Sequence, residues 1–178
     1  MTGENSPVIS KEKRMLLFFL ISVGLVAADQ ITKAIAVAYL KPITTFPLIK
    51  DVLHLTYHEN TGAAFSMLDG FRWGFVIIAV IVCGILVYVN LVKKVDSKLF
   101  YTASILVVSG AIGNVIDRVA TGAVVDFIDF RLINFPVFNF ADICLTIGVV
   151  ILFFAILFTP EKKKAAKTEE ENADDNGN

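Results

Sequence analysis

Two aspartates flank the short segment that joins the last two apolar stretches of the chain. Asp126 lies in the run VVDF and Asp142 lies in the run FNFAD. Two carboxylates held close together cannot both ionise easily, so one keeps its proton while the other acts as a base. Such a pair activates water and polarises a peptide carbonyl without a metal, another cofactor or a nucleophilic side chain. Asp126 and Asp142 are therefore a candidate catalytic pair.

Each of these aspartates also has a structural interpretation, which spacing alone leaves open. Asp142 opens an apolar stretch, where a helix dipole stabilises a carboxylate and Asn139 is a suitable N-cap. Asp126 is equally consistent with an ordinary loop residue. Asp129, in the same segment, is interpreted as a solvated loop residue.

The first apolar stretch carries two charged residues, Asp29 and Lys33. Their i, i+4 spacing places them on one face of a helix, where they can form an ion pair. Charges inside an apolar stretch are costly and usually functional. Two roles remain open: a structural pair near the membrane interface, or a pair that orients an outer loop or a substrate carbonyl.

The third apolar stretch ends in the polar run SGAIGNVIDR. Asn114, Asp117 and Arg118 can share one helix face, because they are three or four residues apart. Gly110 is small enough to let another helix approach closely. These residues either brace a site or take part in its chemistry.

The elements that must position these residues follow from composition. The chain has 178 residues, of which 56% are hydrophobic, and its net charge of −1 does not suggest a nucleic-acid partner. The apolar residues are concentrated in four stretches, each close to the roughly 17–25 residues that cross a bilayer as a helix. We predict an all-α polytopic membrane protein with spans at about 15–40, 73–92, 99–116 and 143–159.

The basic residues predict the orientation of these spans. They cluster before the first stretch, between the second and third, and after the fourth, at Lys11, Lys13, Arg14, Lys93, Lys94, Lys98, Lys162, Lys163, Lys164 and Lys167. Both termini are then cytoplasmic. The unusual aspartates all fall near the extracytoplasmic side, which suggests one site.

The remaining segments complete the predicted organisation. Residues 41–72 contain β-branched and aromatic runs, which predict a small β-rich subdomain on the outer membrane surface. Residues 117–142 form the outer loop that carries the aspartates, so the membrane domain covers 15–159. Residues 1–14 are a polar cytoplasmic N-terminus, and 160–178 a charged, disordered tail. No CxxC or HExxH motif is present, so no metal site is expected.

Five runs, taken together and in this order, resemble bacterial lipoprotein signal peptidase (signal peptidase II). They are DQITK, NTGAAFS, GAIGNVIDR, VVDF and FNFAD, beginning at Asp29, Asn60, Gly110, Val124 and Phe138. The resemblance covers roughly residues 15 to 159. Each run is weakly specific alone, but their order on four spans is highly specific.

The resemblance implies an intramembrane aspartic endopeptidase of the bacterial cytoplasmic membrane, with its active site on the extracytoplasmic side. It would cleave prolipoproteins before a diacylglyceryl-modified cysteine, among membrane phospholipids, and be inhibited by the cyclic peptide globomycin. Asp126 and Asp142 match the family's catalytic pair. The matching supporting positions are Asp29, Lys33, Asn60, Gly110, Asn114, Asp117, Arg118, Asn139 and Ala141, with Asp117 structural.

Two other functions account for the pattern less well. A small proton-coupled transporter also places carboxylates in membrane helices, but it predicts aspartates at all depths and helices broken by Gly or Pro. Here the aspartates lie near one side and no proline falls inside a predicted span. A structural scaffold would not require so many carboxylates at one depth.

Overall fold

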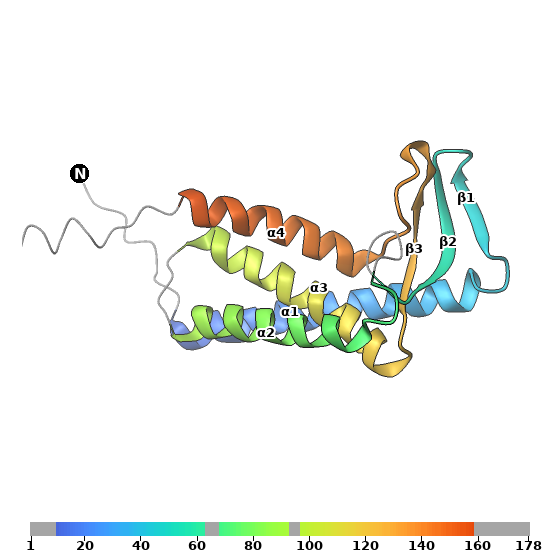
Figure 1. The fold of residues 1–178 in the computed structure, drawn as a ribbon. Coiled ribbons are helices and arrows are strands. Elements are labelled where there is room, and N and C mark those ends of the chain that lie inside the picture. Colours follow the sequence, from blue (N-terminus) through green and yellow to red (C-terminus); the bar gives the residue numbers. More distant parts are fainter. Residues whose placement is uncertain (1–9, 63–67, 93–96, 159–178) are drawn as a thin grey trace, which may run out of the picture.

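Four long helices run side by side, and a small sheet crosses one end of them (Figure 1). The computed structural model describes residues 10–62, 68–92 and 97–158. Its helices are α1 (Lys11–Tyr39), α2 (Arg72–Val92), α3 (Lys98–Ala120) and α4 (Phe140–Phe158). All four are long and apolar enough to cross a membrane, as predicted. Residues 1–9 and 159–178 of the predicted polar ends lie outside the described residues.

The helices continue into polar residues that lie outside the spans predicted from hydropathy. Ser10 and Ser97 cap α1 and α3, because their side chains accept hydrogen bonds from Lys13 N and Phe100 N. At its other end α3 continues to Ala120, past the predicted end at Ile116. This last part of α3 is helical although polar, because its side chains find partners in the neighbouring elements.

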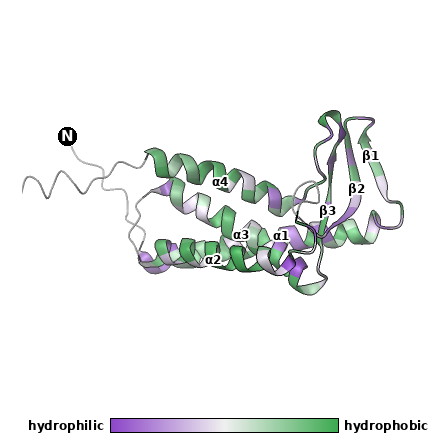
Figure 2. Cartoon of the chain, in the orientation of Figure 1, coloured by the Kyte–Doolittle hydropathy of each residue, from purple (hydrophilic) through white to green (hydrophobic). Residues whose placement is uncertain are grey.

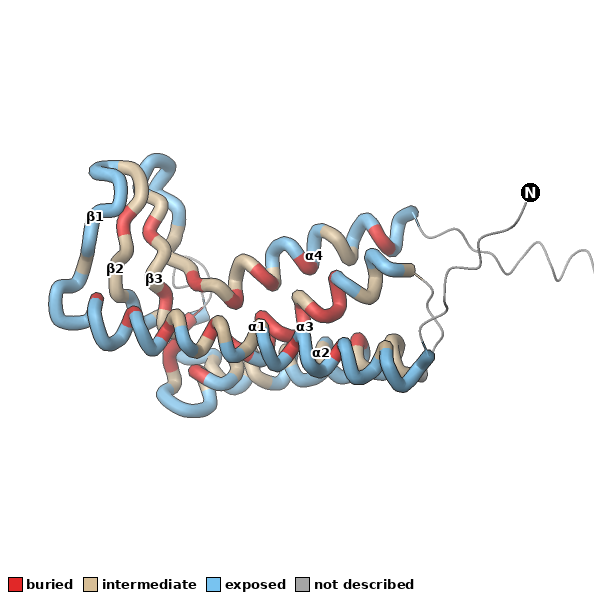
Figure 3. The backbone as a smooth tube through the Cα atoms, turned by 180° about the vertical axis from the view of Figure 1, so that it is seen from behind, coloured by how far each residue is buried: buried red, intermediate tan, exposed pale blue. Residues whose placement is uncertain are grey.

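Helix α3 is the centre of the bundle and packs against the other three helices. Figure 3 shows its buried residues as an almost continuous red stretch. An apolar core around Phe18, Leu86 and Ile105 joins α1, α2 and α3. On α4, a Cβ atom added at Gly148 would lie 2.8 Å from Val107 Cγ2, so α3 and α4 pack with almost no space between them. The outward faces of α2 and α4 are exposed and apolar, as expected for lipid contact.

The sheet is antiparallel, in the order β1 (Thr45–Ile49), β2 (Leu53–Asn60) and β3 (Val124–Phe130). The first two strands confirm the predicted β-rich segment. The third comes from the segment predicted as a loop, and a 3-10 turn, η2 (Arg131–Ile133), follows it. Asp126 is therefore a strand residue, which brings the outer segment against the end of the bundle.

The prediction that Asp129 is solvated is wrong. Asp129 lies on β3 with 8% of its surface exposed. Its Oδ2 accepts hydrogen bonds from Thr56 Oγ1 at 2.7 Å and from Arg131 Nε at 2.8 Å. Burial raises the pKa of Asp129, but these two hydrogen bonds and the Arg131 charge outweigh it, so the pKa lies below its ordinary value.

Hydrophilic residues gather where the helices meet the sheet, while the rest of the bundle is mostly hydrophobic (Figure 2). The outer half of α1, the end of α3, the start of α4 and the base of β3 all contribute to this region. It contains the residues singled out by the sequence.

Candidate active site

The start of α4 holds Asp142 in a reciprocal pair of hydrogen bonds with Asn139. Asn139 Oδ1 accepts from Asp142 N at 3.0 Å, and Asp142 Oδ2 accepts from Asn139 N at 3.1 Å. This arrangement is that of a capping box, which satisfies two of the unpaired N–H groups of a helix start. It fixes the Asp142 carboxylate at the end of the helix.

Asn139 also holds Asp126, so it brings the two aspartates together. Its Nδ2 donates to Asp126 Oδ1 at 2.6 Å, and Asn60 Nδ2 donates to Asp126 Oδ2 at 3.0 Å. Asn60 is itself fixed, because its Oδ1 accepts from Gly62 N. Both carboxylate oxygens of Asp126 are therefore occupied by amide donors from β2 and from the start of α4.

Asp126 is 1% exposed and has a strongly shifted pKa. Burial and the nearby Asp142 carboxylate raise the pKa of Asp126 from 3.8 to about 7, although the hydrogen bonds from Asn60 and Asn139 act in the opposite direction. An aspartate that is protonated near neutral pH can donate a proton to a reacting group.

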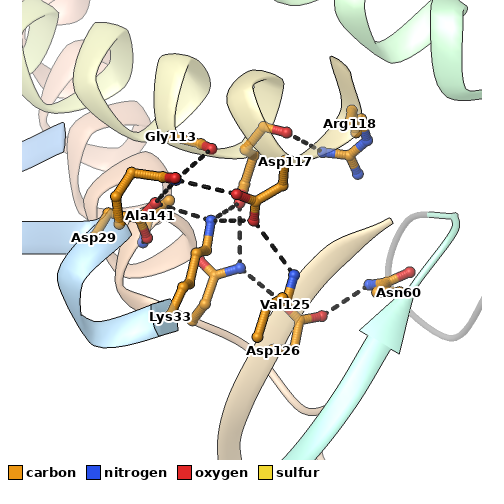
Figure 4. A network of polar contacts seen from close by, with 12 residues as sticks. Asp29, Lys33, Asn60, Gly113, Asp117, Arg118, Val125, Asp126 and Ala141 are labelled. Carbon is orange, nitrogen blue, oxygen red and sulfur yellow. Dashed lines mark hydrogen bonds and ion pairs between the residues drawn. The ribbon is translucent and has the colours of Figure 1, made fainter. Parts of the chain in front are cut away.

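A buried lysine forms ion pairs with two helix carboxylates beside Asp126 and Asp142 (Figure 4). Lys33 Nζ lies 2.8 Å from Asp29 Oδ2 and 2.8 Å from Asp117 Oδ2. The same ammonium donates to Asn114 Oδ1 at 2.9 Å. All of its three hydrogens have acceptors, as a buried lysine requires. The predicted Asp29–Lys33 pair is thus present, and Asp117 joins it.

Asn114 connects this charged cluster to the aspartate pair. Its Nδ2 donates to Asp142 Oδ1 at 2.8 Å. Its Oδ1 receives hydrogen bonds from Lys33 and from Asn139. Asn114 thereby links α1, α3 and the start of α4 through one side chain.

Two aspartates of the bundle also bind the backbone next to the paired aspartates. Asp29 Oδ1 accepts from Ala141 N at 2.9 Å, and Ala141 precedes Asp142. Asp117 Oδ2 accepts from Val125 N at 3.3 Å, and Val125 precedes Asp126. The backbone next to Asp126 and next to Asp142 is therefore anchored to the helices.

Sequence reasoning did not select Gln30, which belongs to the same network. Gln30 Nε2 lies 3.1 Å from Gly113 O, 3.1 Å from Asp117 Oδ1 and 3.2 Å from Asp29 Oδ2. It joins α1 to α3 and adds a neutral donor between two carboxylates. The signal was an amide inside an apolar stretch, immediately after Asp29.

The two glycines of α3 permit this close approach of the elements. A Cβ atom added at Gly113 would lie 2.5 Å from Asp29 Oδ2, and one added at Gly110 would collide with Ala141 O on α4. As its small size predicted, Gly110 lets α4 approach α3 closely. No side chain could replace either hydrogen without moving a residue of the network.

Arg118 lies apart from the lysine cluster, beside a cavity of about 710 Å³. Its Nη2 donates to Gly62 O at 2.9 Å, and its guanidinium stacks 4.8 Å from the Phe75 ring centroid. Apolar side chains of α2, α3 and α4 line most of the cavity. Asp126 and Asp142 also line it, so both residues border an apolar chamber.

The fold and the site define a four-helix membrane protein in which a buried aspartate, Asp126, and a partly buried one, Asp142, line an apolar cavity. In the part of the chain that the structure describes, no cluster of His, Cys, Asp or Glu is arranged to hold a metal ion. The sequence profile of the family described as Signal peptidase (SPase) II matches residues 21–158. The chain belongs to the signal peptidase II family.

Individual relatives and solved structures agree with this assignment. The chain is 44% identical to a lipoprotein signal peptidase of Brevibacillus brevis, over 83% of this chain and 99% of that protein. It is 41% identical to a lipoprotein signal peptidase of Clostridioides difficile, over 84% and 100%. A solved structure described as a bacterial membrane enzyme has a TM-score of 0.75 and 41% identity, covering 83% of this chain and 92% of that one.

Proposed function

We propose that this protein is an intramembrane aspartic endopeptidase that removes signal peptides from prolipoproteins, with Asp126 and Asp142 as the catalytic pair. One observation carries the proposal: Asn139 hydrogen-bonds to both carboxylates where they line the apolar cavity. The family assignment and the relatives named lipoprotein signal peptidase support the substrate class.

The proposed chemistry needs one proton on the carboxylate pair. The ionised carboxylate takes a proton from a water molecule, whose oxygen attacks the carbonyl carbon of the scissile peptide bond. The protonated carboxylate donates to the carbonyl oxygen and so stabilises the charge that develops there. The carboxyl group that took the water proton then gives a proton to the leaving nitrogen. The C–N bond breaks as the carbonyl re-forms and its oxygen returns a proton to the other carboxylate. The raised pKa of Asp126 supports it as the proton donor.

The shape of the cavity supports an apolar helical substrate. A signal peptide has an apolar segment, and the cavity walls from α2, α3 and α4 are mostly apolar. Such a segment would lie in the cavity with its cleavage site at the carboxylates. Cleavage would take place before a diacylglyceryl-modified cysteine, whose lipid would remain among the membrane phospholipids.

The location of the site supports an extracytoplasmic active site in the bacterial cytoplasmic membrane. The basic residues Lys11, Lys13 and Arg14 lie at the start of α1, and Lys98 opens α3. Both helices start at the end of the bundle opposite to the sheet (Figure 1). Basic residues favour the cytoplasmic side, so the sheet and the carboxylates would face outward. We further propose residues 15–159 as the catalytic domain and globomycin as a competitive ligand of the cavity.

The test is cleavage of a diacylglyceryl-modified prolipoprotein by the purified protein in nanodiscs, followed by the gel shift on loss of the signal peptide. Asp126→Asn and Asp142→Asn are compared with Asp51→Asn, which changes an exposed aspartate in the turn between β1 and β2. We expect wild type and Asp51→Asn to cleave, and both site variants to be folded and inactive. Globomycin should slow the wild type competitively.

Two results would contradict the proposal. Substantial activity in a folded Asp126→Asn or Asp142→Asn variant would exclude that residue from the catalytic pair. Wild-type protein that is folded but never cleaves a lipid-modified substrate would exclude the peptidase function, and proton-flux measurements would then test the transporter alternative.

A further inference from the structure

The β2 strand contains a bulge directly opposite the catalytic segment of β3. Leu55 pairs with Ile128 and His58 pairs with Asp126, so Thr56 and Tyr57 together face the single residue Phe127. A bulge of this kind shifts the register by one residue and changes the face toward which later side chains point. The Phe127 N–H hydrogen-bonds to Phe138 O instead of β2.

This shift decides whether Asn60 can reach Asp126. With the bulge, Asn60 pairs with Val124, which lies two residues from Asp126 and therefore on the same face. A diagonal neighbour on the same face is within reach of a side chain, and the hydrogen bond from Asn60 Nδ2 to Asp126 Oδ2 is 3.0 Å. If the register of Leu55 continued unbroken, Asn60 would lie opposite Ala123 and point away from Asp126.

The bulge is held by the buried side chain of Asp129. Asp129 Oδ2 accepts from the hydroxyl of Thr56, a residue of the bulge itself, at 2.7 Å. Arg131 Nε holds the same oxygen, and Thr45 Oγ1 on β1 lies 3.0 Å from Thr56 Oγ1. The bulge is thus tied to both neighbouring strands by side chains, on the face opposite to Asp126.

We propose that Asp129 is a positioning residue, which fixes the β2 bulge through Thr56 and thereby places Asn60 in hydrogen-bonding contact with Asp126. This inference rests on the proposed function only in that Asp126 is the reactive group. It gives a role to an aspartate that does not line the cavity, and it makes Thr56 part of the same device.

The test compares variants that remove or keep the Thr56 hydroxyl. Thr56→Val removes it at nearly constant size, and Thr56→Ser keeps it. Asp129→Ala removes the acceptor, while Asp129→Asn keeps an oxygen. Thr102→Val is the matched control, because Thr102 is an exposed residue near the start of α3.

Two readouts report on Asp126 itself. One is the pH dependence of kcat/KM, and the other is the titration of the Asp126 carboxyl by ¹³C NMR, which needs no activity. Asp142 on α4, Lys33 on α1 and Arg118 on α3 act electrostatically on Asp126, and His58 faces it from β2. All profiles are therefore recorded in a His58→Gln background, so that this imidazole does not titrate.

Thr56→Val and Asp129→Ala should release the bulge and move the Asn60 amide away from Asp126. Because the Asn60 hydrogen bond favours the ionised form of Asp126, its loss should raise the apparent pKa of that carboxyl. They should also lower kcat/KM by up to about 100-fold, since a small misplacement of a reactive group is costly. Thr56→Ser and Thr102→Val should match the wild type, and Asp129→Asn should be intermediate. In an Asn60→Ala background, Thr56→Val should cause no further shift in the pKa of Asp126, because the amide through which it acts is already absent.

The proposal is overturned if folded Thr56→Val leaves the pKa of Asp126 unchanged. It is also overturned if the pKa shift caused by Thr56→Val adds in full to the shift caused by Asn60→Ala. Should Asp129→Ala not fold, the Thr56→Val and Thr56→Ser pair decides alone. If the wild type does not cleave, the proposed function fails, but the NMR titration still tests the link between Thr56 and Asp126.

Discussion

Gly113 lies so close to Asp29 that a Cβ atom added to the glycine would be 2.5 Å from Asp29 Oδ2. Asp29 is on α1 and Gly113 is on α3, so the size of one residue sets how closely the two helices approach. The same carboxylate binds Lys33 and the backbone N–H of Ala141. Any displacement of Asp29 is therefore transmitted to the start of α4, next to Asp142.

Gly113→Ala should therefore cost both stability and activity. Overpacking of this kind costs about 1–3 kcal/mol, in spite of the better helix propensity of alanine. Gly24→Ala and Gly84→Ala are the controls, because nothing lies within 4 Å of a Cβ atom added there. Thermal melts in one detergent measure stability, and the cleavage assay measures activity. Equal melting temperatures of Gly113→Ala and Gly84→Ala would contradict this prediction.

Lys33→Met should destabilise the protein by about 3–5 kcal/mol, because it leaves two buried carboxylates without their counter-ion. Asp29 and Lys33 have side chains only 2% and 4% exposed. Lys41→Met is the matched control. Lys41 pairs with Glu59, but their side chains are 57% and 52% exposed, and solvent screening leaves such pairs with little effect on stability. Similar melting temperatures for the two variants would show that Lys33 is not the required counter-ion.

Asn139 variants should separate helix capping from orientation of the aspartate pair. Asn139→Asp keeps an N-cap oxygen, whereas Asn139→Ala removes it at a cost of about 1 kcal/mol. Both variants lose the amide that donates to Asp126, so activity should fall by about 100-fold in each. The prediction is that stability differs between them and activity does not. If Asn139→Asp retained wild-type activity, Asn139 would act only as a cap.

The raised pKa of Asp126 predicts how activity depends on pH. Its value of about 7 means that Asp126, the proposed proton donor, loses its proton as the pH rises through that value. The high-pH limb of kcat/KM should therefore have its midpoint near 7, as an apparent value of the coupled pair. Activity that stays constant from about pH 6 to pH 9 would exclude Asp126 as the proton donor.

The raised pKa of Asp126 also predicts that the stability of the folded protein decreases as the pH rises. The unfolded chain releases the Asp126 proton near 3.8, whereas the folded protein keeps it until about 7. A folded-state pKa above the unfolded one contributes stability that is present below 3.8 and is lost as the pH rises through 7. The melting temperature should decrease from about pH 5 to pH 8, and Asp126→Asn should weaken that decrease.

Much of the helical part of the fold follows from hydropathy alone, because a lipid-facing helix needs a long apolar run. The polar ends of α3 and α4 do not follow from it, since their stability depends on partners such as Lys33 for Asp117. β3 was missed for a related reason. The segment VVDFIDF is rich in β-branched and aromatic residues, but its pairing partner is β2, far away in the chain, and the segment alone does not identify that partner.

The site was predicted unevenly for similar reasons. Asp29 and Lys33 are conspicuous because charge is rare in apolar sequence. Asp129 is not, because an aspartate between β-branched and aromatic residues looks the same whether it faces water or the Thr56 hydroxyl. Gln30 carries no charge, and its three acceptors come from α1 and α3. A bulge is a property of two paired strands, so a single strand sequence cannot reveal it.

The hydrogen bond between Asp29 and the Ala141 N–H joins the first helix of the chain to the start of the last one. During synthesis on the ribosome, the first three helices are made before residues 139–142. Until then, Asp29 and Asn114 lack the hydrogen-bond partners that this segment supplies. The network closes only when residues 139–142 have emerged and α4 has been inserted. A nascent or truncated chain therefore has no assembled carboxylate pair, and the order of membrane insertion sets the moment at which the site is complete.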